Sequence, residues 1–182
     1  MKFTATEFQG LWIIDPERHS DPRGYFCETF RADLFEQATG MRPDFVQDNE
    51  SESVRGVVRG LHYQAGTYAQ AKLVRAVSGE ILDVALDLRR HSPTFGRHFA
   101  MRLSAENGRQ LFIPRGFAHG FAVLSPTARF LYKTDNYYAP QAERTILFND
   151  PALAIAWPFT EGDMLLSPKD LAGKLFVEAE TF

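Results

Sequence analysis

The stretch "GRQLFIPRGFAHGF", residues 108–121, decides the fold of this 182-residue chain. It begins with Gly108 and a short apolar run, which Pro114 and Gly116 then interrupt. Proline and glycine favour a tight turn, and the apolar residues on either side are typical of β-strands. We therefore predict two short strands joined by a turn, of which the second directs His119 toward the interior of a β-sheet protein.

Short apolar runs of this kind recur along the chain, and turn-forming residues separate them. In "ILDVALDL" the acids Asp83 and Asp87 interrupt the aliphatic residues, which is typical of a half-buried strand. One helix is predicted over residues 31–40, ending at Gly40, and a short second helix begins at Ser167, which precedes a proline. The predicted strands span residues 11–14, 24–30, 57–63, 72–77, 81–88, 98–104, 110–114, 119–124, 128–134 and 144–148.

The spacing of Gly108, Pro114, Gly116 and His119 resembles the second sequence motif of the cupins. Cupins are small jelly-roll barrels whose mouth holds the active site. About ten short strands in one domain also favour a sandwich, jelly roll or barrel. We therefore expect an all-β fold, a double-stranded β-helix or jelly roll (a cupin-like barrel) with a few short helices. A single domain is expected over residues 1–182, because this length is typical of one domain.

The composition limits the possible partners. A formal net charge of −3 predicts no binding to nucleic acid or to an anionic membrane, so an anionic ligand would need a local group of Arg and Lys. No apolar run approaches the ~18 residues of a membrane span, and the first residues lack the apolar stretch of a signal peptide. Cys27 is the only cysteine, which excludes an internal disulfide and fits a reducing compartment. We expect a cytoplasmic protein.

The first cupin motif normally supplies metal ligands as His-x-His followed by Glu. Here the matching stretch is "LHYQAGTYAQAKL", residues 61–73, in which Gln64 replaces the second histidine and Lys72 holds the approximate place of the acid. An amide and an ammonium do not complete a tight divalent site with two histidines. We therefore expect no metal at this site. A metal-dependent cupin dioxygenase or isomerase is the less favoured alternative.

The chemistry that remains is acid–base chemistry. His62, Lys72, His119 and, if its strand also lines the pocket, Tyr132 provide a base, a cation and an acid. Such a set suits proton abstraction beside a carbonyl, because the developing enolate oxygen needs a donor. Taken singly, a strand histidine is more often structural, a tyrosine a wall residue and a lysine a solvated charge. Their occurrence within one motif frame favours the catalytic interpretation.

Several motifs together resemble the dTDP-4-dehydrorhamnose 3,5-epimerase family, in the family's order, from about residue 12 to residue 171. They are "DPRGYFCETF" (21–30), "FVQDN" (45–49), "RGLHYQ" (59–64), "QAKLVRAVSGEILDVALDLRRHSPTFG" (70–96), "LSAENGRQLFIPRGFAHGF" (103–121), "FLYKTDNYYAPQAERTILFNDP" (130–151) and "LSPKD" (166–170). The resemblance implies a cofactor-free isomerase acting on a dTDP-linked 4-keto-6-deoxyhexose. Through an enolate it would invert C3 and C5 of dTDP-4-dehydro-6-deoxy-D-glucose, giving dTDP-4-dehydro-L-rhamnose.

The resemblance also implies residue roles. His62 would be the base, and Tyr132 the acid on the opposite face of the sugar. Asp170 would orient the imidazole, and Lys72 would stabilise the enolate. A homodimer is implied as well, in which residues near the N-terminus reach the site of the neighbouring subunit. Substrate-binding roles are implied for Arg23, Phe26, Glu28, Gln47, Asn49, Arg59, His119, Tyr138, Glu143 and Lys169.

Two further alternatives stay open at this stage. A single-centre 3- or 5-epimerase of secondary-metabolite deoxysugar biosynthesis would use the same residues, because the outcome depends on how the ring is held. Departures from the common pattern at Arg115 and in "GRHFAM", residues 96–101, leave that choice undecided. A non-catalytic jelly roll that binds nucleotide sugars would keep the phosphate-binding cations but would not need a His–Asp pair opposite a tyrosine.

Overall fold

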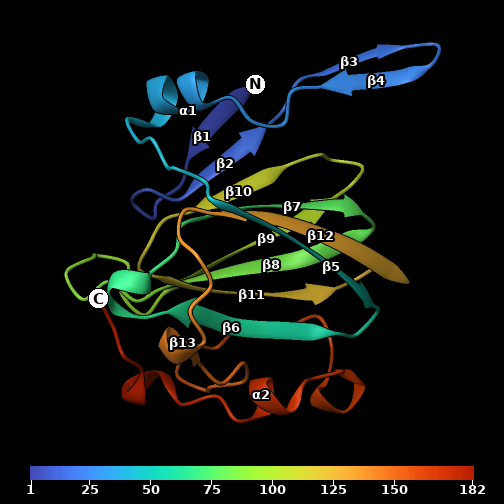
Figure 1. Ribbon diagram of the computed structural model, residues 1–182. Coiled ribbons are helices and arrows are strands. Elements are labelled where there is room, and N and C mark those ends of the chain that lie inside the picture. The colour runs from blue at the N-terminus through green and yellow to red at the C-terminus, as the bar shows by residue number, and fades with distance from the viewer.

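Two antiparallel sheets lie face to face in the computed structural model, which describes residues 1–182 (Figure 1). The strands are β1 (Lys2–Ala5), β2 (Trp12–Asp15), β3 (Arg18–Asp21), β4 (Gly24–Cys27), β5 (Gln47–Val54), β6 (Val58–Gln64), β7 (Lys72–Ser78), β8 (Glu80–Asp87), β9 (His98–Ser104), β10 (Gln110–Ile113), β11 (Phe117–Val123), β12 (Thr127–Thr134) and β13 (Glu143–Thr145). One sheet has the order β1-β2-β10-β7-β12-β5 and the other β13-β6-β11-β8-β9. Because the chain passes repeatedly between the sheets, the fold is a cupin-like jelly roll, as expected from the sequence.

The core has three layers of packing. Fourteen buried residues, including Leu103, Phe121 and Phe130, fill the space between the two sheets. A second cluster that includes Ile146 lies where the C-terminal segment covers the outside of the five-stranded sheet, below β6 in Figure 1. A third cluster, centred on Phe35, packs against the outside of the six-stranded sheet. Each sheet is therefore packed against apolar residues on both faces, which stabilises the position of the two sheets relative to each other.

The two expected helices are both present. α1 (Ala32–Thr39) turns Phe35 toward the six-stranded sheet and ends at Gly40, whose φ of 71° is a left-handed cap that glycine adopts without strain. α2 (Pro168–Leu171) begins after Ser167, which caps it. Neither is long and apolar enough to cross a membrane. Short 3₁₀ turns span Gly66–Tyr68, Pro140–Ala142, Glu161–Asp163 and Phe176–Glu178.

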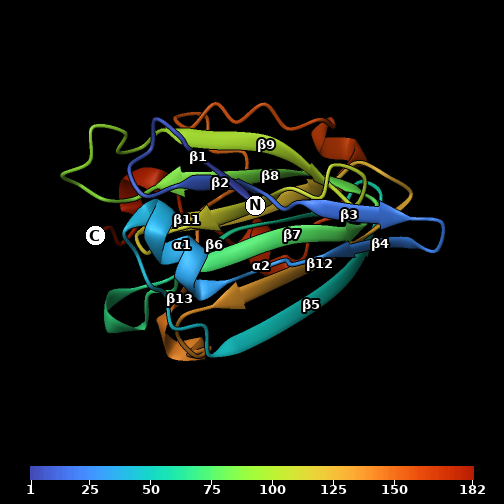
Figure 2. The same cartoon turned by 90° about the horizontal axis from the view of Figure 1, so that it is seen from above.

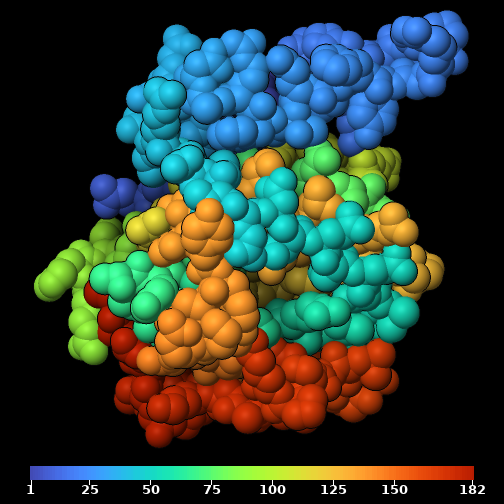
Figure 3. Space-filling model, in the orientation of Figure 1, coloured from blue at the N-terminus to red at the C-terminus, as the bar shows by residue number.

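Three strands, β1, β3 and β5, were not predicted from the sequence. β5 reads "QDNESESV" and has no apolar alternation, yet it pairs with β12 at every position from Gln47 to Val54. Its place in the sheet is thus set by tertiary pairing and not by local preference. The strand expected over residues 24–30 extends only over β4, which forms an exposed hairpin with β3. Figures 2 and 3 show this hairpin projecting beyond the body of the molecule.

The prediction that β8 is half-buried was wrong. Asp83 and Asp87 are fully buried, because β8 lies between β11 and β9 in its sheet and is covered on both faces. The carboxylate of Asp87 accepts hydrogen bonds from Arg89 at 2.7 Å and Thr94 at 2.7 Å, and that of Asp83 contacts His119. Buried carboxylates need such partners, so these two acids are interior groups with specific tasks.

Two glycines allow β6 and β11 to approach closely. A Cβ atom on Gly60 would lie 2.6 Å from the Cα atom of Gly120, a distance that real side chains do not reach. Gly60 also has a φ of 124°, which favours glycine. The pairing register shifts just after His119, and the result is that His62 lies directly opposite His119.

Candidate active site

A cavity of about 330 Å³ opens between the two sheets and is lined by strands from both. Asp170 lies directly behind one of its walls, in contact with His62, and Gln47 is hydrogen-bonded to the lining residue Asn49. The cavity therefore gathers most of the residues predicted from the sequence. Those that line it are Asn49, Arg59, His62, Lys72, His119, Tyr132, Tyr138, Glu143 and Lys169.

His62 and Asp170 form a dyad at one wall. Nε2 of His62 is buried and lies 2.8 Å from Oδ1 of Asp170, a contact in which the ring N–H is not fully aligned on the oxygen. The same carboxylate accepts hydrogen bonds from the backbone N–H of Gly60 and from Ser167. Burial favours the protonated acid, but His62 and these hydrogen bonds outweigh it and hold the pKa of Asp170 well below its ordinary value. Asp170 is thus a fixed anion behind the ring, which leaves Nδ1 for the cavity.

A second dyad lies next to the first. Nε2 of His119 is 2.8 Å from Oδ2 of Asp83, and the ring stacks on Phe130 with an interplanar angle of 17°. Burial lowers the pKa of His119; Asp83 opposes this shift, and the charges of Lys72 and His62 add to it. His119 is therefore a neutral ring with one nitrogen fixed by a buried acid.

Lys72 is one of three cationic side chains that line the cavity, together with Arg59 and Lys169. It begins β7, close to both histidines, and its ammonium group has no ion-pair or hydrogen-bond partner in the protein. Burial lowers the pKa of Lys72 to about 8, with a further lowering by Lys169, while Asp83 and Glu143 oppose the shift. An ammonium group without a protein partner is available to an oxygen of a ligand.

Tyr132 faces the cavity from the opposite sheet. It lies on β12, and its ring packs against Phe130 with the centroids 5.6 Å apart. Burial and the charge of Glu143 raise the pKa of Tyr132, and Arg59 opposes the shift. The phenol is therefore protonated at neutral pH. Because His62 comes from one sheet and Tyr132 from the other, a ring bound between the sheets has a base on one face and an acid on the other.

The rim of the cavity is a network of polar contacts. The Tyr138 hydroxyl donates to Oε2 of Glu143 at 3.0 Å, and Lys169 forms an ion pair with the other carboxylate oxygen. Burial opposes ionisation, but both contacts keep the pKa of Glu143 below its ordinary value. Gln47 accepts a hydrogen bond from the backbone N–H of Tyr138 at 3.0 Å. Arg59, on the facing side, is steadied by Ser53, which accepts from its Nε at 3.1 Å.

Three predicted residues lie away from the cavity within one chain. Arg23 and Phe26 belong to the exposed β3–β4 hairpin, and Glu28 follows it. The Arg23 side chain is 89% exposed and pairs only with Asp21. Phe26 is 67% exposed, which is unusual for so large an apolar side chain. None of the three contributes to the site of its own chain.

Sequence reasoning missed several residues that shape the site. Asp83 was predicted only as part of a half-buried strand, with no role at the site, although it is fully buried and contacts His119. Ser53 belongs to β5, which has no apolar pattern that would predict a strand. Gln64 was noted only as a missing metal ligand. One feature of the sequence could have indicated these contacts, namely the acids at 83 and 87 in an otherwise aliphatic run, because buried acids require partners.

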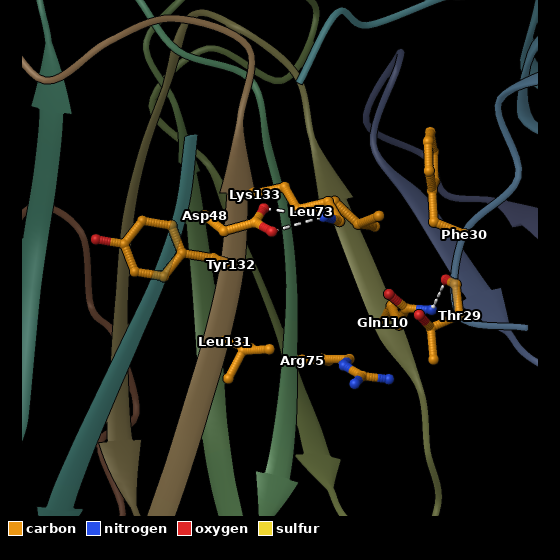
Figure 4. Close-up of a pocket in the computed structure, with 9 residues that line it drawn as sticks. All are labelled: Thr29, Phe30, Asp48, Leu73, Arg75, Gln110, Leu131, Tyr132 and Lys133. Atoms are coloured by element: carbon orange, nitrogen blue, oxygen red, sulfur yellow. Dashed lines mark hydrogen bonds and ion pairs between the residues drawn. The ribbon is translucent and has the colours of Figure 1, made fainter. Parts of the chain in front are cut away.

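A smaller hollow of about 130 Å³ lies on the other side of β12 (Figure 4). In that view the ring of Tyr132 points away from Gln110 and Thr29, and Tyr132 also lines the larger cavity. Two pairs of polar groups bind one another here: Lys133 pairs with Asp48 at 2.9 Å, and Gln110 donates to the carbonyl of Thr29 at 2.6 Å. This hollow offers no acid–base pair, so we assign the chemistry to the larger cavity.

The larger cavity combines a base, a phenol and a free cation. Nowhere in the molecule do three or more His, Cys, Asp or Glu side chains gather in a way that could hold a metal ion. The geometry suits removal of a proton from one face of a ring and its return on the other, with the cation near a developing negative charge.

Comparison with known proteins identifies the ligand class of the relatives. The family model described as dTDP-4-dehydrorhamnose 3,5-epimerase matches residues 5–178. A dTDP-4-dehydrorhamnose 3,5-epimerase of Pseudomonas aeruginosa is 53% identical over 100% of this chain and 99% of its own length. A dTDP-4-dehydrorhamnose 3-epimerase of Streptomyces niveus is 40% identical over 98% of this chain and 86% of its own.

A solved structure agrees with these relatives. The crystal structure of the dTDP-6-deoxy-D-glucose-3,5-epimerase of Legionella pneumophila, in complex with dTDP-4-keto-L-rhamnose, has a TM-score of 0.94 and 49% identity. The alignment covers 98% of this chain and 94% of that one. Fold, site and relatives define an isomerase of the carbohydrate-epimerase class on a cupin-like jelly roll. More narrowly, the chain belongs to the dTDP-4-dehydrorhamnose 3,5-epimerase family, which confirms the resemblance seen in the sequence.

Proposed function

We propose that this chain inverts C3 and C5 of dTDP-4-dehydro-6-deoxy-D-glucose and so produces dTDP-4-dehydro-L-rhamnose. The observation that carries the proposal is the placement of His62 and Tyr132 on opposite sheets around one cavity, with the unpaired ammonium of Lys72 beside them. Epimerisation needs groups on both faces of a ring, which a binding protein does not need.

The proton transfers follow from this geometry. The hydrogens on C3 and C5 are acidic because each carbon adjoins the C4 ketone. Nδ1 of His62 takes one of them, the C–H electron pair becomes the enolate, and Asp170 stabilises the resulting imidazolium. Lys72 stabilises the enolate oxygen. Tyr132 then gives its phenolic proton to the opposite face of the carbon, and solvent restores both residues to their starting states.

The nucleotide end of the substrate would occupy the rim. Arg59 and Lys169 supply positive charge for the pyrophosphate, for which the planar guanidinium of arginine is well suited. Tyr138 offers a ring that is half exposed and anchored at its hydroxyl, which fits stacking with the thymine base. Gln47 accepts from the backbone N–H of Tyr138 and donates to Asn49, which places both polar side chains near this end of the cavity.

We further propose a homodimer in which the β3–β4 hairpin of each subunit reaches the cavity of its partner. Arg23 would then add a cation to the pyrophosphate site, with Phe26 and Glu28 beside the base and sugar. The supporting observation is that the hairpin projects from the body with Tyr25 and Phe26 exposed (Figure 1). Sedimentation equilibrium of the wild type and of Phe26→Asp tests the assembly. The cytoplasmic location also stays a prediction, which cell fractionation checks.

A single-centre epimerase is the second candidate, since the Streptomyces niveus relative is a 3-epimerase. Arg115, one of the departures from the common pattern, donates to Asp135 at 2.9 Å and does not line the cavity. It therefore gives no support to a change in how the sugar is held.

Incubation with dTDP-4-keto-6-deoxyglucose in heavy water, followed by proton NMR, tests the proposal. Deuterium at both C3 and C5, together with reduction of the product by a rhamnose-forming reductase, is the expected result. Label at one carbon alone would make the chain a single-centre epimerase. Absence of label at both carbons would overturn the enzymatic proposal for this substrate.

A further inference from the structure

Gln64 lies at the position where the cupin pattern has its second histidine, and it lines the cavity two residues after His62. Residues two apart on a strand share a face, so both side chains point into the space between the sheets. Gln64 is nonetheless 4% exposed. A long polar side chain that lines a cavity and is almost inaccessible must have its hydrogen bonds within the protein.

The amide of Gln64 makes three such bonds. Its Nε2 donates to the carbonyls of Tyr68 at 2.7 Å and Tyr137 at 3.1 Å, and its Oε1 accepts from the backbone N–H of Ala139 at 2.6 Å. A carbonyl can only accept and a backbone N–H can only donate. These three partners therefore show which end of the side-chain amide is Nε2 and which is Oε1. The side chain is therefore occupied by backbone and has little capacity left for a ligand.

The hydrogen bonds that Gln64 makes to Tyr137 and Ala139 lie on either side of Tyr138 in the chain. This residue lies in the segment between β12 and the turn Pro140–Ala142, which has no sheet partner of its own. Gln64 holds the peptide groups on both sides of it, and Gln47 holds its N–H from β5. Its hydroxyl bonds to Glu143, which lies opposite Gln64 in the β6–β13 pairing. Gln64 thus holds the backbone on both sides of Tyr138, and Glu143 on the neighbouring strand β13 holds its hydroxyl.

We propose that Gln64 is a positioning residue that holds Tyr138 at the cavity rim in the orientation that binds the nucleotide end of the substrate. The inference rests on the proposed function in one respect, namely that Tyr138 contacts the thymine base. It accounts for an amide at this position. Histidine offers one donor and one acceptor when neutral, and a glutamate would face two carbonyl oxygens with no donor. Only an amide supplies two donors and an acceptor from one planar group.

Gln64→Glu is the isosteric test, because it keeps the shape and removes both donors. Gln141→Glu is the matched control: it adds the same charge near the same segment, but Gln141 is exposed and its amide bonds to nothing in the protein. We expect Gln64→Glu to raise the Kd for dTDP and the KM about tenfold, with a smaller fall in kcat, since weaker binding and unchanged chemistry act separately. Gln141→Glu should leave both constants within about twofold.

A double-mutant cycle separates positioning from general damage. If Gln64 acts through Tyr138, then Gln64→Glu adds little to the effect of Tyr138→Ala on the Kd for dTDP. An equal further weakening in the double variant would overturn the proposal, as would an unchanged Kd in the single one. Gln64→Met, which removes the hydrogen bonds without adding charge, replaces Gln64→Glu if thermal melting shows that the latter does not fold.

Amide hydrogen exchange provides a readout without a ligand. Exchange at Tyr138 and Ala139 should accelerate in the Gln64 variant and not in Gln141→Glu, while the strands exchange as before. Equal protection of these amides in the wild type, the Gln64 variant and Gln141→Glu would contradict the positioning role of Gln64. Failure of wild-type protein to bind dTDP would instead refute the proposed function, and the exchange rates would still decide whether Gln64 holds the segment.

Discussion

His62 and His119 are direct partners across the β6–β11 pairing, and each places Nε2 2.8 Å from a buried aspartate. Their surroundings differ. The His62 side chain is 26% exposed and faces the open cavity, whereas that of His119 is 7% exposed. Burial lowers the pKa of His119, despite Asp83, so His119 stays neutral beside Lys72. In the proposed reaction His62 would take the proton, while the more deeply buried and neutral His119 would present a fixed ring to the sugar.

Replacing His62 by alanine should abolish epimerisation and leave nucleotide binding intact. The base is lost, but the rim residues remain 
in place, so we expect kcat to fall about 10³-fold and the Kd for dTDP to change less than about threefold. Steady-state kinetics and calorimetric titration with dTDP check this. His91→Ala, at an exposed position, is the control and should behave as wild type. Full activity of His62→Ala would exclude the proposed base.

Tyr132→Phe should separate proton removal from inversion. His62 can still exchange a ring hydrogen with solvent, but no acid is left on the opposite face to complete the inversion. We expect deuterium incorporation to persist while product formation falls about 10²-fold. Proton NMR in heavy water measures both in one sample. Tyr137→Phe, whose side chain is 65% exposed, serves as control. Loss of exchange in parallel with product formation would argue against separate roles for the two residues.

Replacing Lys72 by methionine should slow epimerisation. It should also show that the desolvated ammonium group of Lys72 lowers the stability of the fold. Without an ammonium near the enolate oxygen, we expect kcat to fall about 10²-fold. With the pKa of Lys72 at about 8 in the free enzyme, kcat/KM of the wild type should decline above about pH 8, a decline that the variant lacks. Lys174→Met, at the surface, should retain the wild-type profile.

The same pKa has a consequence for stability. The pKa of Lys72 is lower in the folded than in the unfolded chain, so the unfolded state binds more protons between about pH 8 and pH 10. The free energy of unfolding of the wild type should therefore rise with pH in this window relative to Lys72→Met. Urea denaturation at several pH values checks the sign. A difference that does not change with pH would show that Lys72 is not desolvated.

Asp170→Asn should weaken the fold at neutral pH. Because the folded pKa of Asp170 is depressed, its carboxylate stabilises the protein above about pH 4, and this contribution is lost as the pH falls further. We expect a loss of about 2 kcal/mol in the free energy of unfolding at pH 7, and a smaller difference at pH 3. Urea denaturation at both pH values measures it. An equal difference at the two values would mean that the charge of Asp170 does not matter.

The residues that the sequence could reveal are those whose role is local. The turn at Pro114 and Gly116, the stop at Gly40 and the cap at Ser167 depend on backbone preferences of single residues, and all lie where they were expected. Apolar alternation identified most core strands for the same reason. β5 was not predicted, because a strand at a partly exposed sheet edge that is held by pairing with its neighbour need not be apolar.

The sequence by itself determined the fold class, the motif frame around His62 and His119, and the family, because short-range patterns of turns and apolar residues encode them. The resemblance implied that Asp170 orients His62, but only the tertiary structure decided the contact distance and the pairing of Asp83 with His119. Asp170 reaches His62 from the far end of the chain, and Asp83 reaches His119 from the neighbouring strand. Such contacts depend on strand order and register, which no local pattern specifies.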